Sequence, residues 1–154
     1  PAAGAGCSFA LAGDIVIAGR SAYFLQAFVN IGLVPDVGST WLLPRLAGRA
    51  RAQAMMMLGE RIPAEQAESW GMIWKCVDDA ALMDSAMAMA QRLAAMPSRA
   101  LAATRRVIDA GSRSSLTEAV MLEARTQGEL GRAHDFAEGV AAFLDKRAPK
   151  FSDR

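Results

Sequence analysis

The sequence predicts a mixed α/β fold in which short strands come first and helices follow. Short apolar segments bounded by turn residues, typical of buried strands, occur only in the first half of the chain. Amphipathic segments with helix start and stop signals fill the remainder. With 154 residues, 53% of them hydrophobic, the chain is long and apolar enough to bury a core.

Composition excludes several function classes. The 17 basic and 16 acidic residues leave a net charge of +1, which gives no strong field to attract nucleic acid or an anionic membrane. The longest apolar runs fall well short of the ~20 residues of a membrane span. Cys7 and Cys76 lie far apart without CxxC spacing, so we expect no disulfide framework, no metal site and a reducing cytoplasm.

The first residues show no secretory signal. The chain begins at Pro1, a start that either a missing upstream segment or removal of an initiator Met would explain. Small residues then lead into a short apolar helix within 4–12, whose first amides form a potential anion site. The alternative is a glycine-rich turn that only permits close packing. Residues 14–18 and 22–24 predict two strands joined as a β-turn-β unit.

A loop is expected at 33–38, because Pro35 fixes φ, Asp36 can bond the backbone ahead of it and Gly38 adds conformational freedom. Beyond it the sequence becomes almost wholly helical. We expect one strand at 72–77 and helices over 39–47, 49–58, 63–70, 79–95, 98–110, 116–130 and 136–147.

Local signals set several helix boundaries. Pro63 is expected at a first helical position, with Gly71 just past the end of the same helix. The S-x-x-E motif at 115–118 predicts a capping box, and the D-x-x-E motif at 135–138 predicts an analogous Asp-capped start. Two helices carry apolar faces that need a partner surface. These faces are formed by Leu82, Ala86, Met89, Leu93 and Met96, and by Phe136, Val140 and Phe143.

Four segments, in matching order and spacing, resemble the crotonase (enoyl-CoA hydratase/isomerase) superfamily. Each is weak alone, but together they are specific and cover essentially the whole chain. They are AGAGCSFALAGD at 3–14, followed by Phe24, GLVP at 32–35 and LPRLAG at 43–48; GERIPAEQA at 59–67; WGM at 70–72; and DFAEGVAAFLDKRAPKF at 135–151.

The resemblance implies a crotonase/ClpP-like fold, of which this chain is the C-terminal portion. Residues 1–78 would complete the ββα core, and residues 79–154 would form the helical trimerisation region. By the same resemblance, one of the two backbone N–H donors of an oxyanion hole is that of Ala5, with the Gly6 N–H beside it, and the other donor would lie in the missing N-terminal half. Such donors stabilise the oxygen on which charge accumulates when a proton leaves the carbon next to a thioester.

The family's hydratases use two glutamates, and their positions correspond here to Ser8 and Phe28. Neither side chain is a general base at neutral pH, so efficient hydration is not expected. Asp36 instead matches the single acid/base carboxylate of some isomerases, in the ring-1,2-epoxyphenylacetyl-CoA isomerase group and related Δ3,Δ2-enoyl-CoA isomerases. The alternative is an Asp that only caps a turn or the following helix.

The resemblance therefore favours an enoyl-CoA isomerase of fatty-acid or phenylacetate metabolism. Its substrate would be an acyl-CoA thioester, so coenzyme A needs no separate cofactor site. The partner would be the same chain, in a homotrimer or hexamer. Alternatives are a hydratase with its carboxylates elsewhere, or a catalytically incomplete fragment that acts only in assembly. Residues expected to contact the substrate are Gly4, Ser8, Phe28, Val34 and Pro35.

Three further residues receive structural interpretations. His134, the single histidine, lies in a polar segment beside the expected cap at Asp135, which indicates a surface role. Cys7 lies at a helix start where thiolates are stabilised, but the family resemblance favours simple packing. The three methionines at 55–57 are expected to fill the core.

Overall fold

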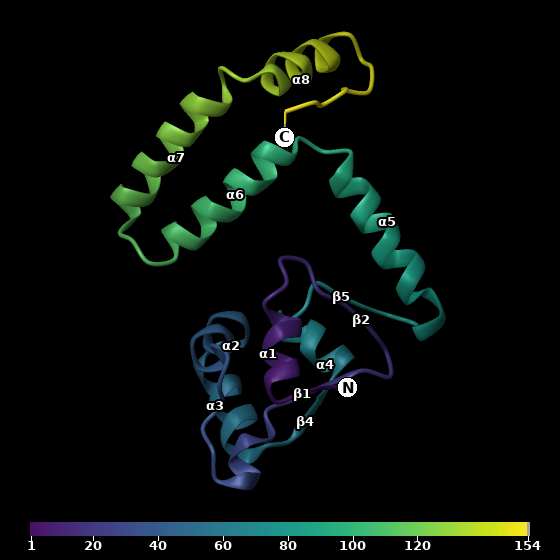
Figure 1. The fold of residues 1–154 in the computed structure, drawn as a ribbon, viewed down its shortest axis with the longest axis vertical. Helices are drawn as coiled ribbons and strands as arrows, with labels where there is room; N and C mark the ends of the chain where they lie inside the picture. The colour runs from purple at the N-terminus through teal and green to yellow at the C-terminus, as the bar shows by residue number, and fades with distance from the viewer. Residues whose placement is uncertain (154) are drawn as a thin grey trace. The chain divides into compact units, whose positions relative to one another are not determined.

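The computed structural model describes residues 1–153 as two compact units, unit 1 from Pro1 to Met87 and unit 2 from Ala88 onwards. Its content is mixed α/β with few, short strands, as the sequence predicts (Figure 1). The expected functional division into 1–78 and 79–154 stays a prediction.

Unit 1 holds two small sheets. In the first, β3 (Tyr23–Leu25) lies between β1 (Ala2–Ala3), to which it is parallel, and β4 (Arg61–Pro63), to which it is antiparallel. The second pairs β2 (Ile17–Gly19) in parallel with β5 (Lys75–Val77).

The predicted β-turn-β unit is wrong, because β2 and β3 belong to different sheets. The groups that flank β2 bond to the β5 segment instead. The Val16 carbonyl accepts from the amides of Trp74 and Lys75, at 2.9 and 3.3 Å, and the Arg20 amide donates to Val77 O at 2.8 Å. Strands β1 and β4 were not predicted at all.

The helices of unit 1 follow the sequence closely. The predictions for α2 (Ser39–Ala47) and α3 (Arg49–Leu58) are confirmed, and these helices pack on each other. Short helices α1 (Ala5–Leu11) and α4 (Ala64–Ser69) and the 3₁₀ helices η1 (Ala27–Ile31) and η2 (Asp79–Ala81) complete the unit.

The boundary of α4 differs from the expectation by one residue. Pro63 ends β4 in an extended conformation, with φ −59° and ψ 154°, so it precedes the helix instead of starting it. Gly71 does follow the helix end, as predicted, with a left-handed φ of 75°.

The core of unit 1 gathers apolar side chains from both sheets and four helices. Leu43 and Met55 are its largest fully buried apolar side chains. Of the three adjacent methionines, Met55 is buried and Met56 packs against the core, but Met57 is exposed, so the expectation of core filling holds only in part. The other members of this cluster include Cys7, Leu11, Phe24, Ala52, Ile62 and Met72.

Unit 2 is helical. The predicted helix 79–95 is divided into η2 and α5 (Leu82–Ala94), which crosses the boundary between the units. α6 (Ser98–Gly111) and α7 (Leu116–Leu130) then run side by side, and α8 (His134–Leu144) follows (Figure 1). The capping box is confirmed: Ser115 Oγ accepts from the Glu118 amide, and the Glu118 carboxylate accepts from the Ser115 amide.

The predicted Asp-capped start of the last helix is wrong. α8 begins at His134 with Ala133 as its N-cap, and no side chain caps it. The Asp135 carboxylate instead accepts from the amides of Ser152 and Asp153, at 2.7 and 3.2 Å, in the C-terminal tail. The helix ends at Leu144, earlier than predicted, and Lys146 beyond it has a left-handed φ of 53°.

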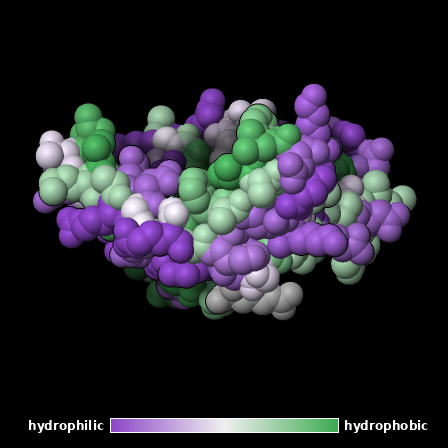
Figure 2. Space-filling model, turned by 90° about the horizontal axis from the view of Figure 1, so that it is seen from above, coloured by the Kyte–Doolittle hydropathy of each residue, from purple (hydrophilic) through white to green (hydrophobic). Residues whose placement is uncertain are grey.

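Many large apolar side chains of unit 2 reach the surface. The predicted face of Phe136, Val140 and Phe143 exists and is exposed. On the side of the molecule drawn in Figure 2, apolar surface interrupts the polar surface in several places. No helix within residues 1–153 combines the length and apolar character needed to cross a membrane.

Candidate active site

Gly4 makes the turn from β1 into α1. Its φ of 54° and ψ of −128° lie outside the regions that other L-residues adopt readily. Its amide donates to Leu25 O at 2.8 Å, and a Cβ added here would lie 3.6 Å from the Phe28 ring. Glycine at this position therefore allows the sharp turn and keeps the start of α1 free of side-chain bulk.

The amides at the start of α1 divide into two pairs. Those of Cys7 and Ser8 donate to Gly4 O, at 3.0 and 3.3 Å. Those of Ala5 and Gly6 precede the first intrahelical bond, so no carbonyl of the helix accepts from them. Ala5 is half-buried and Gly6 is exposed. Two adjacent backbone donors are thus available for an oxygen that carries negative charge.

Asp36 lies in a tight turn that leads into α2. The Ser39 amide donates to Asp36 O at 3.1 Å, and the two central residues, Val37 and Gly38, have positive φ values of 49° and 79°. The Asp36 side chain is exposed, and its carboxylate has no hydrogen-bond partner within residues 1–153. Gly38 is the N-cap of α2 and no side chain caps that helix, so Asp36 does not cap α2, although its backbone carbonyl does open the turn.

Behind the turn lies a buried polar cluster of Gln26, Ser39 and Ser8. Gln26 Nε2 donates to Ser39 Oγ at 2.9 Å, and the hydroxyls of Ser39 and Ser8 are hydrogen-bonded to each other. Ser8 Oγ also lies 3.3 Å from Asp36 O and 3.4 Å from Gly4 O. Since Ser8 is only 2% exposed, this burial does not favour the predicted contact between its side chain and a substrate.

The structure brings together most of the residues that the sequence singled out. Phe28 lies in η1, half-buried, with its ring beside Gly4. Pro35 is half-buried and Val34 exposed in the loop before Asp36.

Sequence reasoning missed Gln26 and Ser39. Their signals were weak: a polar residue directly after an apolar strand, and a serine three positions after Asp36, where a β-turn closes.

Cys7 belongs to the core. Its side chain is fully buried, and this burial raises the pKa of its thiol to about 11. A reactive thiolate is therefore disfavoured at neutral pH, which supports the interpretation of Cys7 as a packing residue.

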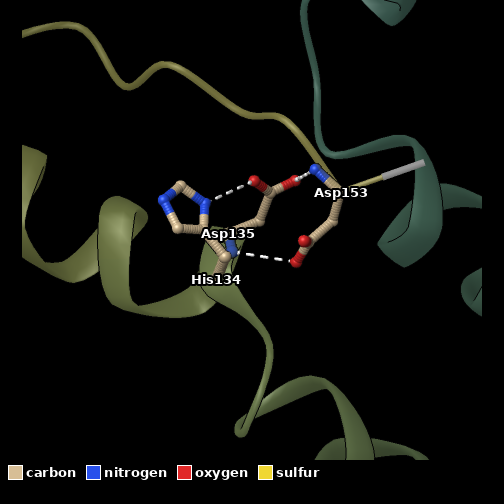
Figure 3. Close-up of side chains that lie close together, drawn as sticks. All are labelled: His134, Asp135 and Asp153. Carbon is tan, nitrogen blue, oxygen red and sulfur yellow. Dashed lines mark hydrogen bonds and ion pairs between the residues drawn. The ribbon is translucent and has the colours of Figure 1, made fainter.

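His134 begins α8 at the surface of unit 2, next to Asp135 and Asp153 (Figure 3). Its Nδ1 lies 3.5 Å from Asp135 Oδ1, and the Asp135 amide donates to Asp153 Oδ2 at 3.0 Å. Burial alone would raise the pKa of the Asp135 carboxyl, but hydrogen bonds from the Ser152 and Asp153 amides lower it. The three side chains are spaced closely enough for a metal ion. Their arrangement is already explained by the hydrogen bonds between Asp135 and residues 152–153, which hold the C-terminal tail against the start of α8.

Comparison with known proteins identifies the family. The model of the enoyl-CoA hydratase/isomerase family matches residues 1–154. The chain belongs to the enoyl-CoA hydratase/isomerase family. It is 50% identical over 153 residues to 1,2-epoxyphenylacetyl-CoA isomerase of Escherichia coli K12, covering 99% of this chain and 58% of that protein.

Two further family members place this chain in context. It is 51% identical over 153 residues to a Rhodobacter capsulatus protein named probable enoyl-CoA hydratase, covering 99% of this chain and 60% of the relative. The crystal structure of an enoyl-CoA hydratase from Polaromonas sp. JS666 superposes with a TM-score of 0.94 at 36% identity, over 98% of this chain and 59% of that one.

These matches confirm the predicted crotonase-type fold. They also confirm the predicted likeness to 1,2-epoxyphenylacetyl-CoA isomerase. In this hydratase/isomerase family, the chain spans about three-fifths of the length of the relatives that it matches.

Proposed function

We propose that the protein containing this chain is an enoyl-CoA isomerase in which Asp36 is the acid/base. One observation carries the proposal. The positions that correspond to the hydratase glutamates hold a buried Ser8 and an apolar Phe28, whereas the Asp36 carboxylate is exposed and uncapped. An exposed carboxylate, together with two helix-start amides that have no acceptor in their own helix, suits proton transfer beside a thioester.

The mechanism needs one carboxylate. With a 3-enoyl-CoA substrate, Asp36 removes a proton from C2, and the electron pair delocalises onto the thioester oxygen. The amides of Ala5 and Gly6 donate to this oxygen while the dienolate exists. Protonated Asp36 then returns the proton to C4, and the double bond moves to the 2,3 position. Coenzyme A enters and leaves as part of the substrate, so no further cofactor is required.

The relatives support both the family chemistry and an alternative. The Escherichia coli relative is an isomerase, which favours the proposal. The Rhodobacter capsulatus relative carries the name of a hydratase, which keeps water addition to a 2-enoyl-CoA as the second candidate activity. A hydratase would require carboxylates from elsewhere in the protein, because Ser8 and Phe28 cannot activate water.

The deciding experiment is Asp36→Asn in the complete protein, assayed for double-bond migration in a 3-enoyl-CoA. We expect kcat to fall by about 10²- to 10⁴-fold, the usual contribution of a general acid/base, with little change in KM. Asp84→Asn, at an exposed position on α5, is the matched control and should keep the wild-type rate. An unchanged rate in Asp36→Asn would refute the assignment. Crotonyl-CoA hydration as fast as isomerisation would favour the hydratase.

The exposed apolar side chains of unit 2 favour a second candidate function, homotrimeric or hexameric assembly without catalysis. Leu116, Phe143 and Leu144 are 81%, 83% and 72% exposed, more apolar surface than a solvated helix needs. For the 154-residue chain, this candidate predicts a trimer or hexamer by light scattering and weak binding in a coenzyme A titration. A monomer that binds coenzyme A tightly would contradict it.

A further inference from the structure

A buried relay of hydrogen bonds connects the two parts of the proposed active site. It runs from Gln26, after β3, through Ser39, at the start of α2, to Ser8 in α1. From Ser8 it reaches the backbone carbonyl of Asp36. The helix that carries the oxyanion donors is thereby bonded to the turn that carries the acid/base.

The hydrogens of these groups allow a continuous relay toward Asp36. In this relay, Gln26 Nε2 donates to Ser39 Oγ at 2.9 Å, and the Ser39 hydroxyl donates in turn to Ser8 Oγ. The Ser8 hydrogen is then left for Asp36 O, at 3.3 Å, or Gly4 O, at 3.4 Å. Gly4 O already accepts from two amides, whereas within residues 1–153 Asp36 O accepts from one amide, that of Ser39, which favours Asp36 O as the end of the relay.

The turn that receives this bond is one that needs support. Val37 is β-branched and has a φ of 49°, a conformation that such residues rarely adopt. A strained residue of this kind persists only where its surroundings fix it. Since the Asp36 carboxylate has no partner within residues 1–153, its position depends on the backbone that carries it.

We propose that Ser8 is a positioning residue, which sets the place of the Asp36 carboxylate relative to the Ala5 and Gly6 amides by its bond to the Asp36 carbonyl. Gln26 and Ser39 orient the Ser8 hydroxyl for that bond. The inference rests on the proposed function of Asp36. It gives position 8 a role in isomerisation that does not require its side chain to reach the substrate.

The test is a double-mutant cycle in the complete protein, with isomerisation of a 3-enoyl-CoA as the assay. We expect Ser8→Ala to lower kcat by roughly tenfold with KM changed less than about twofold, because a small misplacement of a catalytic group mainly slows the chemical step. In the Asp36→Asn background, the same substitution should change kcat by less than about twofold. Ser8→Thr, which keeps a hydroxyl, should restore most of the rate.

The outcomes separate this inference from the proposed function. An equal loss from Ser8→Ala in both backgrounds, or no loss in the wild type, overturns the positioning role while Asp36→Asn still identifies the acid/base. An Asp36→Asn rate equal to wild type overturns both. Ser69→Ala, which removes an exposed hydroxyl bond to Gln66 O, should leave kcat unchanged. If Ser8→Ala does not fold, Ser39→Ala replaces it in the cycle, with a loss of about threefold expected only when Asp36 is present.

Discussion

Both units expose large apolar side chains, but among the described residues only unit 1 also buries large ones in a core. Among the described residues, the buried apolar side chains lie in unit 1 with two exceptions, Ala103 and Ala142. Unit 2 is fastened by polar groups instead. These are the capping box of α7, the Asp135 bonds to the tail, and the pair of Glu138 with Arg147.

This difference indicates that the secondary structure of the two units is stabilised in different ways. Unit 1 has short strands that no local signal could stabilise alone, so burial must hold them. Unit 2 has helices of 11 to 15 residues, of which α7 begins at a local capping box, and its apolar faces are left available. In the assembly candidate, a partner surface would cover those faces.

The largest effect on stability is expected when the same substitution, Leu to Ala, is compared between the two units. Leu43→Ala removes a side chain that is 1% exposed, and should lower the free energy of unfolding by about 2–5 kcal/mol. Leu144→Ala, at a side chain 72% exposed, is the matched control and should change it by less than about 0.5 kcal/mol. Urea unfolding measures both. A comparable loss at Leu144 would contradict the contrast and indicate that this face is covered in solution.

A smaller effect is expected at the capping box. Ser115→Ala leaves the Glu118 amide without its side-chain acceptor, and should lower the stability of α7 by about 1 kcal/mol. Ser114→Ala, whose hydroxyl makes only a 3.4 Å bond to Gly111 O, should have little effect. Thermal unfolding followed by circular dichroism compares the two variants. Equal stability would show that packing, and not capping, sets the start of α7.

The smallest effect should be visible only as a dependence on pH. Bonds from the Arg147 guanidinium, at 2.7 and 2.9 Å, and then from the Lys150 amide lower the pKa of the Glu138 carboxyl to about 2. Because its pKa is lower in the folded state than its ordinary 4.5, this carboxylate stabilises the fold above about pH 4.5 and stops doing so as the pH falls toward 2.

Glu138→Gln should therefore reduce the melting temperature at pH 7, and the difference from wild type should vanish near pH 2. Glu123→Gln, at an exposed position on α7, should show no such trend. A difference that is constant between pH 7 and pH 2 would mean that the pair with Arg147 does not contribute through its charge.

The features that sequence predicted well are those encoded locally. The helices at 39–47, 49–58 and 116–130, the glycine after α4 and the capping box all depend on residues within a few positions of one another. The exposed Asp36 and the small residues at 4–6 were also identified, but through family resemblance, and their catalytic roles stay predictions.

The features that were missed depend on contacts distant in sequence. Strand β2 pairs with β5 about 58 residues later, and three-residue strands carry too little periodicity to reveal a partner. Asp135 lies three residues before Glu138, the spacing of a helix cap, yet its carboxylate accepts hydrogen bonds from amides 17 and 18 residues further on. Gln26 and Ser39 become significant only when the fold places them behind Ser8.

The buried thiol of Cys7 provides a chemical probe of how often the core of unit 1 opens. With a pKa of about 11, only about one thiol in 10⁴ is ionised at pH 7, and the side chain has no exposed surface. An alkylating reagent must therefore wait until α1 separates from the strands beneath it. The rate at which Cys7 is modified, relative to the half-buried Cys76, reports how often the helix that begins the proposed active site opens.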